Sequence, residues 1–210
     1  MSQKNDKESS FKRERLKFEA KRKAFHSGVF FLPFLYWLFG RTLLLTLAVF
    51  GLFCIAFLEY WRLHDENFFF NRFAREEEQD KIANYVAFFS SVFICIILFE
   101  EYVVVAAVIM AGAGDAFAAL GGISLGRHQL PFTQKKTIEG AIFGASTAFI
   151  VGWLLMQFYD DLTLIAVILG SLVIPLTDMI LSEKPKNVFL GDNFWNPLLI
   201  AVIIWILTLL

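Results

Sequence analysis

The chain has 210 residues, of which 57% are hydrophobic and 25 are Phe, and its formal net charge at pH 7 is only −1. A soluble domain of this length has too little polar surface to cover so many apolar side chains, so the composition excludes an ordinary soluble domain and indicates a bilayer protein. We expect no nucleic-acid partner.

The first 23 residues form a polar, strongly basic segment, which we expect in the cytoplasm ahead of a single transmembrane catalytic domain at 24–210. From Phe11 onward, apolar residues are interleaved with Lys and Arg, a pattern typical of a helix on an anionic leaflet. A solvated basic tail that only sets topology explains the pattern equally well. The segment is too polar and too long to read as a short secretory leader.

Seven apolar runs follow, each read as a helix of roughly 20 residues. The first is short and contains Pro33, so a re-entrant segment is an alternative for it. The fold class we predict is all-α, a polytopic membrane helix bundle with about seven transmembrane segments. The runs are 24–40, 42–60, 83–99, 102–120, 138–158, 162–181 and 195–210.

The basic residues predict the orientation of these segments. With a cytoplasmic N-terminus, all Lys and Arg residues except Arg41 fall in four cytoplasmic parts, as the positive-inside rule requires. We then expect an integral membrane protein, in the inner membrane if the source is bacterial, and any active site built from these four parts would lie on the cytoplasmic side. The four parts are 1–23, 61–82, 121–137 and 182–194.

Two features predict packing rather than chemistry. Gly140, Gly144 and Ala148 recur at a spacing of four and give one helix a small face for close contact. Cys54 and Cys95 both lie inside apolar runs, so we expect buried thiols, although the pair is also able to form a disulfide.

Asp115 is the sharpest candidate for chemistry. It lies late in an apolar run, in "AGAGDAFAAL", after two glycines that could open the helix. An aspartate at that depth is costly and usually faces a cavity, an ion or a substrate. A magnesium ion that accompanies a nucleotide needs such carboxylate oxygens. A helix cap at the interface is the alternative.

The stretch "QKKTIEG" predicts an anion site. Thr137 is a plausible N-cap, which leaves free backbone amides at a positive helix end, and Lys135 and Lys136 can hold phosphates there. Glu139 would bind a metal or orient a lysine. Topology signals and a first-turn acid explain the same residues without a ligand.

The last cytoplasmic loop ends in Asp192 and Asn193, just before the final run. Both are ordinary capping residues, but Asp192 is a second carboxylate on the face that bears Asp115, and two such groups suit a shared magnesium. Asp178 is a third candidate, for which solvation at the interface is the simpler explanation.

His26 and Lys23 lie three residues apart at the entry to the first run, and so share a helix face. His26 is a candidate general base for an alcohol, or only an amphipathic interface residue. Glu59 and Arg62 are also three apart, and we interpret them as an ion pair at the membrane surface.

Six short motifs together resemble the polytopic CTP-using lipid-alcohol kinases: dolichol kinase, phytol kinase and CTP-dependent diacylglycerol kinase, distant relatives of phosphatidate cytidylyltransferase. The resemblance covers residues 22–198. Thr137 stands where the family usually has Ser, and Gly191 where it usually has a first aspartate. The motifs are "RKAFHSG", "EYWR", "REEE", "GDAFAALGGISLGR", "KKTIEG" and "GDNFWNPL".

The resemblance implies a kinase that transfers the γ-phosphoryl group of CTP to a lipid alcohol, such as a polyprenol, a phytol-like alcohol or diacylglycerol. It implies a Mg²⁺ ion held by Asp115 and Asp192. The implied catalytic residues are Asp115, Lys136, Glu139 and His26. The implied nucleotide-binding residues are Gly114, Gly122, Arg127, Lys135, Thr137, Gly140 and Asn193.

Two other functions stay open. A phosphatidate cytidylyltransferase shares the scaffold and the nucleotide but breaks a different phosphate bond. A transporter or structural membrane protein would use Asp115 as an intramembrane coupling residue, but it predicts charges near the midplane and in both halves of the fold. A homodimer is also left open.

Overall fold

The computed structural model describes residues 1–210 except 1–13, 15, 25–26, 66, 75–77 and 182–187. The described residues form helices and loops, with one isolated antiparallel bridge and no strand. An N-terminal helix covers residues 16–24. The α-helices after it are α2 (Leu32–His64), α3 (Asn84–Leu98), α4 (Glu101–Leu125), α5 (Ile138–Leu155), α6 (Leu164–Leu181) and α7 (Asp192–Thr208). Short 3₁₀ helices are η1 (Ser27–Phe31), η2 (Phe69–Phe73) and η4 (Val188–Leu190).

Helix α2 consists of two arms that meet at Gly40. The backbone of Gly40 has φ 65° and ψ 172°, a conformation outside the helical region that only glycine adopts readily. This break separates the first two predicted runs, because one arm ends before Gly40 and the other begins after it. Pro33 lies in the first turn of α2, where its missing N–H costs nothing, rather than in a kink.

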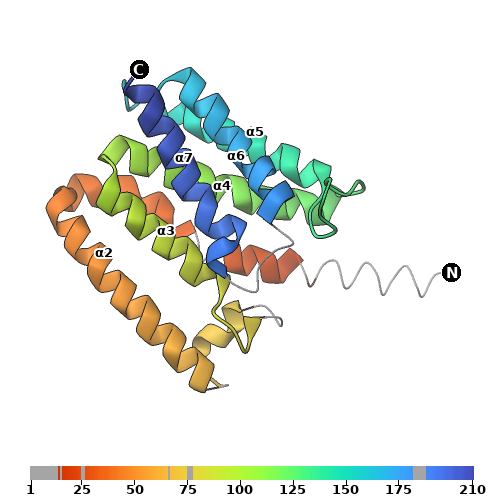
Figure 1. The fold of residues 1–210 in the computed structure, drawn as a ribbon. Helices are drawn as coiled ribbons and strands as arrows, with labels where there is room; N and C mark the ends of the chain where they lie inside the picture. The colour runs from red at the N-terminus through yellow and green to blue at the C-terminus, as the bar shows by residue number, and fades with distance from the viewer. Residues whose placement is uncertain (1–13, 15, 25–26, 66, 75–77, 182–187) are drawn as a thin grey trace.

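Helix α4 occupies the centre of the bundle. All six residues at 103–108 are fully buried, which means that protein surrounds this helix on every side. Helices α3, α5, α6 and α7 pack around it, while α2 runs along the outer edge beside α3 (Figure 1). Cys95 is buried in this core as predicted, whereas Cys54 is only half-buried, and within the described part both are free thiols.

Close packing of α4 on α5 explains most glycines of the two helices. A Cβ at Gly114 would lie 3.1 Å from the Gly144 carbonyl oxygen and 2.0 Å from the Ile174 side chain. A Cβ at Gly140 would lie 2.7 Å from the carbonyl oxygen of Ala118. Contrary to the sequence expectation, the glycines before Asp115 do not open α4, which stays helical throughout. Their small size brings α5 against it instead.

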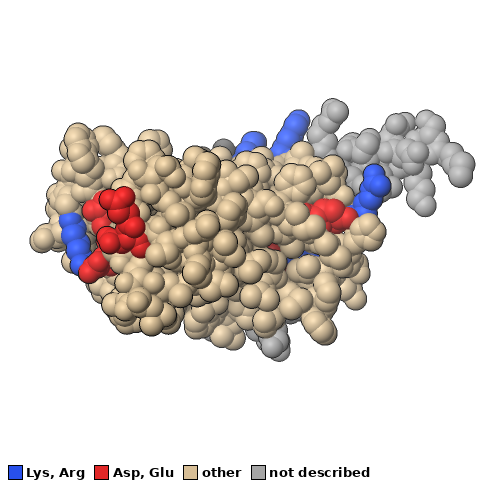
Figure 2. Space-filling view, turned by 90° about the horizontal axis from the view of Figure 1, so that it is seen from above, with Lys and Arg blue, Asp and Glu red and all other residues tan. Residues whose placement is uncertain are grey.

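Four helical stretches of the described chain are long and apolar enough to cross a membrane: Leu16–His64, α4, α5 and α6. Helices α3 and α7 are shorter, and the 15 residues of α3 span only about 22 Å at 1.5 Å per residue. Seven spans therefore remain a proposal. In Figure 2 a broad band almost without charged side chains separates the two charged ends, as a bilayer would require.

The pair Glu59 and Arg62 lies at the end of α2 and is buried, not a surface ion pair as predicted. The guanidinium of Arg62 donates to both carboxylate oxygens of Glu59 at 2.9 and 2.8 Å. It also donates to Asn71 and to the carbonyl oxygens of residues 78, 79 and 81, while Tyr85 and the amide of Ala83 donate to Glu59. This Glu59–Arg62 cluster ties the 65–83 loop to α2 and α3.

Candidate functional site

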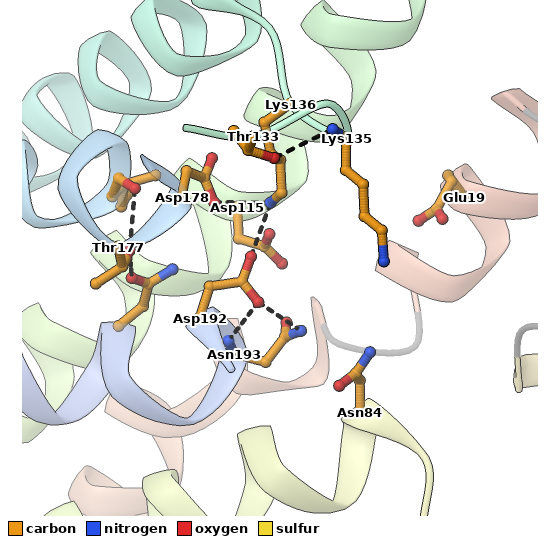
Figure 3. A network of polar contacts seen from close by, with 12 residues as sticks. Glu19, Asn84, Asp115, Thr133, Lys135, Lys136, Thr177, Asp178, Asp192 and Asn193 are labelled. Carbon is orange, nitrogen blue, oxygen red and sulfur yellow. Dashed lines mark hydrogen bonds and ion pairs between the residues drawn. The ribbon is translucent and has the colours of Figure 1, made fainter. Parts of the chain in front are cut away.

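Two lysines and three aspartates from five segments converge at one end of the bundle. Lys136 donates to Asp178 at 2.7 Å and to Asp192 at 2.8 Å. Lys23 donates to Asp115. Figure 3 shows Asp115, Asp178 and Asp192 facing a common space, with the Lys136 side chain entering it from the loop before α5. We call Lys23, Asp115, Lys136, Asp178 and Asp192 the aspartate–lysine cluster.

The electrostatics of the cluster centre on Lys136. Its side chain is partly buried, at 27% exposed, while Asp178 is only 3% exposed and Asp192 14%. Burial acts to lower the pKa of Lys136, but the charges of Asp178 and Asp192 outweigh it and raise that pKa above its usual value. Lys136 is therefore a permanent cation in the neutral pH range, as a phosphate-binding residue must be.

Lys23 brings the N-terminal helix into the site. Three charged residues of that helix, Glu19, Arg22 and Lys23, are buried at 6%, 3% and 5% exposure, and Arg22 pairs with Glu19. The two sequence interpretations of this segment, a helix on the leaflet or a solvated tail, would leave these charges outside the protein. For the described residues 16–24 the structure corrects both, because the face that carries Glu19, Arg22 and Lys23 packs on the bundle and Lys23 contacts Asp115.

Asp192 and Asn193 open α7. The N-cap position of α7 belongs to Gly191, so Asp192 is not the capping residue. Its Oδ1 accepts from the Asn193 backbone amide at 2.9 Å and from the Asn193 side-chain amide at 3.3 Å, which leaves Oδ2 for Lys136. Among the described residues, the buried Oδ1 of Asn193 has no hydrogen-bond partner. Buried polar oxygens in proteins are normally hydrogen-bonded, so this atom is a candidate contact for a ligand.

Asp178 and a polar pair beside it belong to the same region. From its position in the sequence, solvation at the interface is the simpler explanation for Asp178, but this carboxylate is buried and bound to Lys136. The neighbouring Thr177 donates from α6 to the side-chain oxygen of Asn196, which lies on α7 one turn after Asn193. Within the described part the buried Nδ2 of Asn196 has no hydrogen-bond partner. Sequence reasoning missed Asn196, although an asparagine inside an apolar helix is itself a signal.

The loop at 126–137 presents Lys135 and Lys136 to the site. Thr137 caps α5 as predicted, because its side chain accepts from the Gly140 amide at 3.2 Å. The amide of Lys135 donates to the Thr133 hydroxyl at 3.1 Å. In Figure 3 the side chain of Lys135 extends away from the aspartates, towards Glu19 of the N-terminal helix.

Several predicted site residues lie away from the cluster. Glu139 accepts from the backbone amides of Arg127 and His128 and pairs with the His128 ring, so it is bound to the loop rather than to Asp115 or Lys136. Gly114, Gly122 and Gly140 lie where α4 packs against α5 and the residue that caps it. His26 lies outside the described residues.

Magnesium is compatible with the donor atoms of the site, although the described part contains no group of three His, Cys, Asp or Glu side chains arranged to hold a metal. The lysines account for this, since Lys136 lies between Asp178 and Asp192. Carboxylate and amide oxygens are the ligands that Mg²⁺ prefers, and Asp192 stands beside the unpartnered oxygen of Asn193.

Comparisons with known proteins identified no relative of this chain. No family model matches the chain, and no curated protein or solved structure shows significant similarity to it.

Proposed function

We propose that the protein is an integral-membrane kinase that transfers the γ-phosphoryl group of CTP to a lipid alcohol at the cytoplasmic face. The observation that carries the proposal is the convergence of Lys23, Lys136 and the three aspartates at one end of an apolar helix bundle. Charged groups are expensive in such a protein and persist where they have a function.

The charges of the cluster suit a nucleotide triphosphate with its cation. Transfer of a phosphoryl group is mainly positioning and charge neutralisation, for which lysines and a carboxylate-bound magnesium are the usual parts. Lys136 and Lys23 hold phosphates in this proposal, and Lys135 at the rim attracts them. Each lysine exchanges its aspartate partner for a phosphate oxygen when the nucleotide binds.

Magnesium is the implied cofactor, and Asp192, Asn193 and Asp115 are the residues that would hold it. When bound, it supplies neutralisation of the charge on the phosphate oxygens. The buried oxygen of Asn193 without a partner supports this assignment, because a cation would satisfy it.

In the proposed reaction the lipid hydroxyl oxygen forms a bond to the γ-phosphorus of CTP. The bond between that phosphorus and the oxygen bridging to the β-phosphate breaks, and CDP leaves with its electron pair. The hydroxyl proton passes to a base, a role for which His26 is the candidate from the sequence. The lipid reaches the site from the bilayer and CTP reaches it from water.

Isotope labelling tests the reaction. Purified protein is mixed with Mg²⁺, CTP and each of a polyprenol, phytol and a diacylglycerol. We expect label from [γ-³²P]CTP in one of these lipids, release of CDP, and no lipid label from [α-³²P]CTP. Phosphatidic acid serves as the matched acceptor for a cytidylyltransferase.

Lipid labelled from the α position alone, with release of pyrophosphate, would replace the kinase with a cytidylyltransferase. No transfer to any acceptor from either label would contradict both enzymes and favour the transporter or structural protein.

The orientation is a part of the proposal that reporter fusions test separately. Eighteen of the 19 Lys and Arg residues lie in the four parts assigned to the cytoplasm. Fusions after residues 70, 130 and 188 should report the cytoplasm, and fusions after 101, 160 and 210 the opposite side. A cytoplasmic C-terminus would contradict the seven-span topology.

A further inference from the structure

The loop between α4 and α5, residues 126–137, sets the position of Lys136. Its two ends are joined as a short antiparallel pair, with a bridge between Gln129 and Thr137. The amide of Leu130 donates to the carbonyl oxygen of Lys136 at 2.9 Å. The amide of Ile138 donates to the carbonyl oxygen of His128, also at 2.9 Å. The backbone of Lys136 therefore has a fixed place only while this pairing holds.

The loop does not adopt its conformation without cost. Phe132 has φ 65°, in the left-handed region that a bulky side chain rarely enters, and its side chain is 85% exposed. A strained, solvent-facing turn persists where surrounding contacts determine it. Such a contact is needed at the base of the loop, where the chain leaves α4 and returns to α5.

Glu139 supplies that contact from the first turn of α5. Its Oε2 accepts from the backbone amides of Arg127 and His128 at 3.1 and 3.3 Å, and its Oε1 lies 2.7 Å from Nδ1 of His128. One carboxylate thus satisfies two consecutive amides on the outgoing side of the loop. The returning side carries Glu139 itself, so the side chain links both sides.

We propose that Glu139 is a positioning residue that holds the 126–137 loop closed, and so keeps the ammonium group of Lys136 where a phosphate of the nucleotide binds. This inference rests on the proposed function for the identity of the ligand. Of the roles that the sequence left open for Glu139, it favours the orientation of a lysine over metal binding or catalysis, because the carboxylate is bound to loop amides and, within the described part, makes no contact with the aspartate–lysine cluster.

Three variants separate the two roles. Glu139→Ala removes every contact with the loop. Glu139→Gln keeps an oxygen for the two amides and places its amide nitrogen beside Nδ1 of His128, but it removes the charge that a metal would need. His128→Ala removes only the ring contact and leaves the two amide bonds intact. Size-exclusion chromatography in detergent selects the variants that remain folded.

Limited trypsin digestion measures how accessible the loop is and does not depend on enzyme activity. Cleavage after Arg127, Lys135 and Lys136 is followed by peptide mass spectrometry, with cleavage before residue 16 as the internal reference. We expect Glu139→Ala to accelerate loop cleavage by about 10-fold, since each lost bond to a charged group opens the loop, and Glu139→Gln to resemble the wild type. Loop cleavage at the wild-type rate in Glu139→Ala would overturn the proposal.

Steady-state kinetics with CTP then relate the loop to the site. We expect Glu139→Ala to raise the KM for CTP by about 10-fold with a smaller fall in kcat, His128→Ala to have a lesser effect, and Glu139→Gln to restore the wild-type KM. Equal loss of kcat in the Gln and Ala variants would show a carboxylate that acts on the reaction and would overturn the positioning role. If wild-type protein shows no turnover, the proposed function fails while the digestion still decides the role of the loop contact.

Discussion

Two groups of buried charges lie near the same end of the molecule and differ in how completely their polar atoms are paired. In the Glu59–Arg62 cluster the guanidinium donates to Glu59, to Asn71 and to three backbone carbonyl oxygens, and Arg62 is only 2% exposed. In the aspartate–lysine cluster Lys136 is 27% exposed, and the nearby Asn193 oxygen has no partner among the described residues.

We interpret the difference as one between charges that hold the fold and charges that, under the proposed function, bind a ligand. Arg62 has all its N–H groups engaged by groups that stay in place, so nothing can replace its partners without opening the 65–83 loop. Within the described part, the ammonium group of Lys136 has two carboxylate partners, Asp178 and Asp192. In the proposed function both carboxylates are able to bind a cation when Lys136 binds a phosphate. A saturated network stabilises one structure, while an incompletely paired one can exchange partners.

The largest expected effect is on folding, at Arg62. Arg62→Met leaves the Glu59 carboxylate and several buried carbonyl oxygens without a donor, so we expect it to lower the free energy of unfolding by about 3–5 kcal/mol. Arg41→Met, at an exposed position beside the Gly40 turn, is the matched control and should be neutral. Chemical denaturation in detergent measures both. An Arg62→Met variant as stable as the wild type would contradict the claim that the Glu59–Arg62 cluster holds the fold.

The next effect is on catalysis, at Asp192. Asp192→Asn still accepts a bond from Lys136 but loses its charge, so we expect phosphoryl transfer to fall by about 100-fold or more while unfolding changes little. Asp115→Asn should do the same, and the double variant should be no worse than either, because groups that act together are non-additive. Asp161→Asn, at an exposed position in the turn before α6, is the control. Full activity of Asp192→Asn would remove that residue from the site.

A smaller effect compares two helix caps. Thr137 caps α5 beside Lys136, and Thr163 caps α6 at the other end of the bundle, where its hydroxyl accepts from the Ala166 amide at 3.3 Å. Each change to Ala should cost about 1 kcal/mol of stability. Only Thr137→Ala should also raise the KM for CTP, since only that cap lies beside the lysines. Equal KM values for the two variants would argue against a nucleotide at the start of α5.

The sequence predicted the helices well because apolar runs and turn residues act locally. The break at Gly40 separates two runs, and Thr137 caps α5 as its place before "IEG" indicates. The partners of the charges were less predictable, because they come from segments far apart in the chain. Asp178 and Asp192 meet on Lys136 through the packing of α6 and α7, and Lys23 reaches Asp115 across 92 positions.

The glycines and Glu139 show why a motif alone does not define a role. Gly114 and Gly140 stand in the nucleotide motifs of the resemblance, yet their lack of a side chain is explained by the approach of α5 to α4. Glu139 stands three residues from Lys136, but its side chain reaches back to the amides of Arg127 and His128 at the start of the loop. The first outcome depends on how closely two helices pack and the second on the direction of a side chain, and spacing along the chain determines neither.

Titration calorimetry of Mg²⁺ and CTP tests the central claim, that the aspartate–lysine cluster binds a nucleotide while the Glu59–Arg62 cluster holds the fold. We predict one CTP bound per wild-type chain, affinity at least about 10-fold weaker in Lys136→Met because a charge-assisted bond to phosphate is lost, and unchanged affinity in Lys81→Met. Lys81 is the matched control, exposed in the loop that Arg62 holds. Absence of CTP binding to the wild type, or equal affinity in the Lys136→Met variant, would contradict the account.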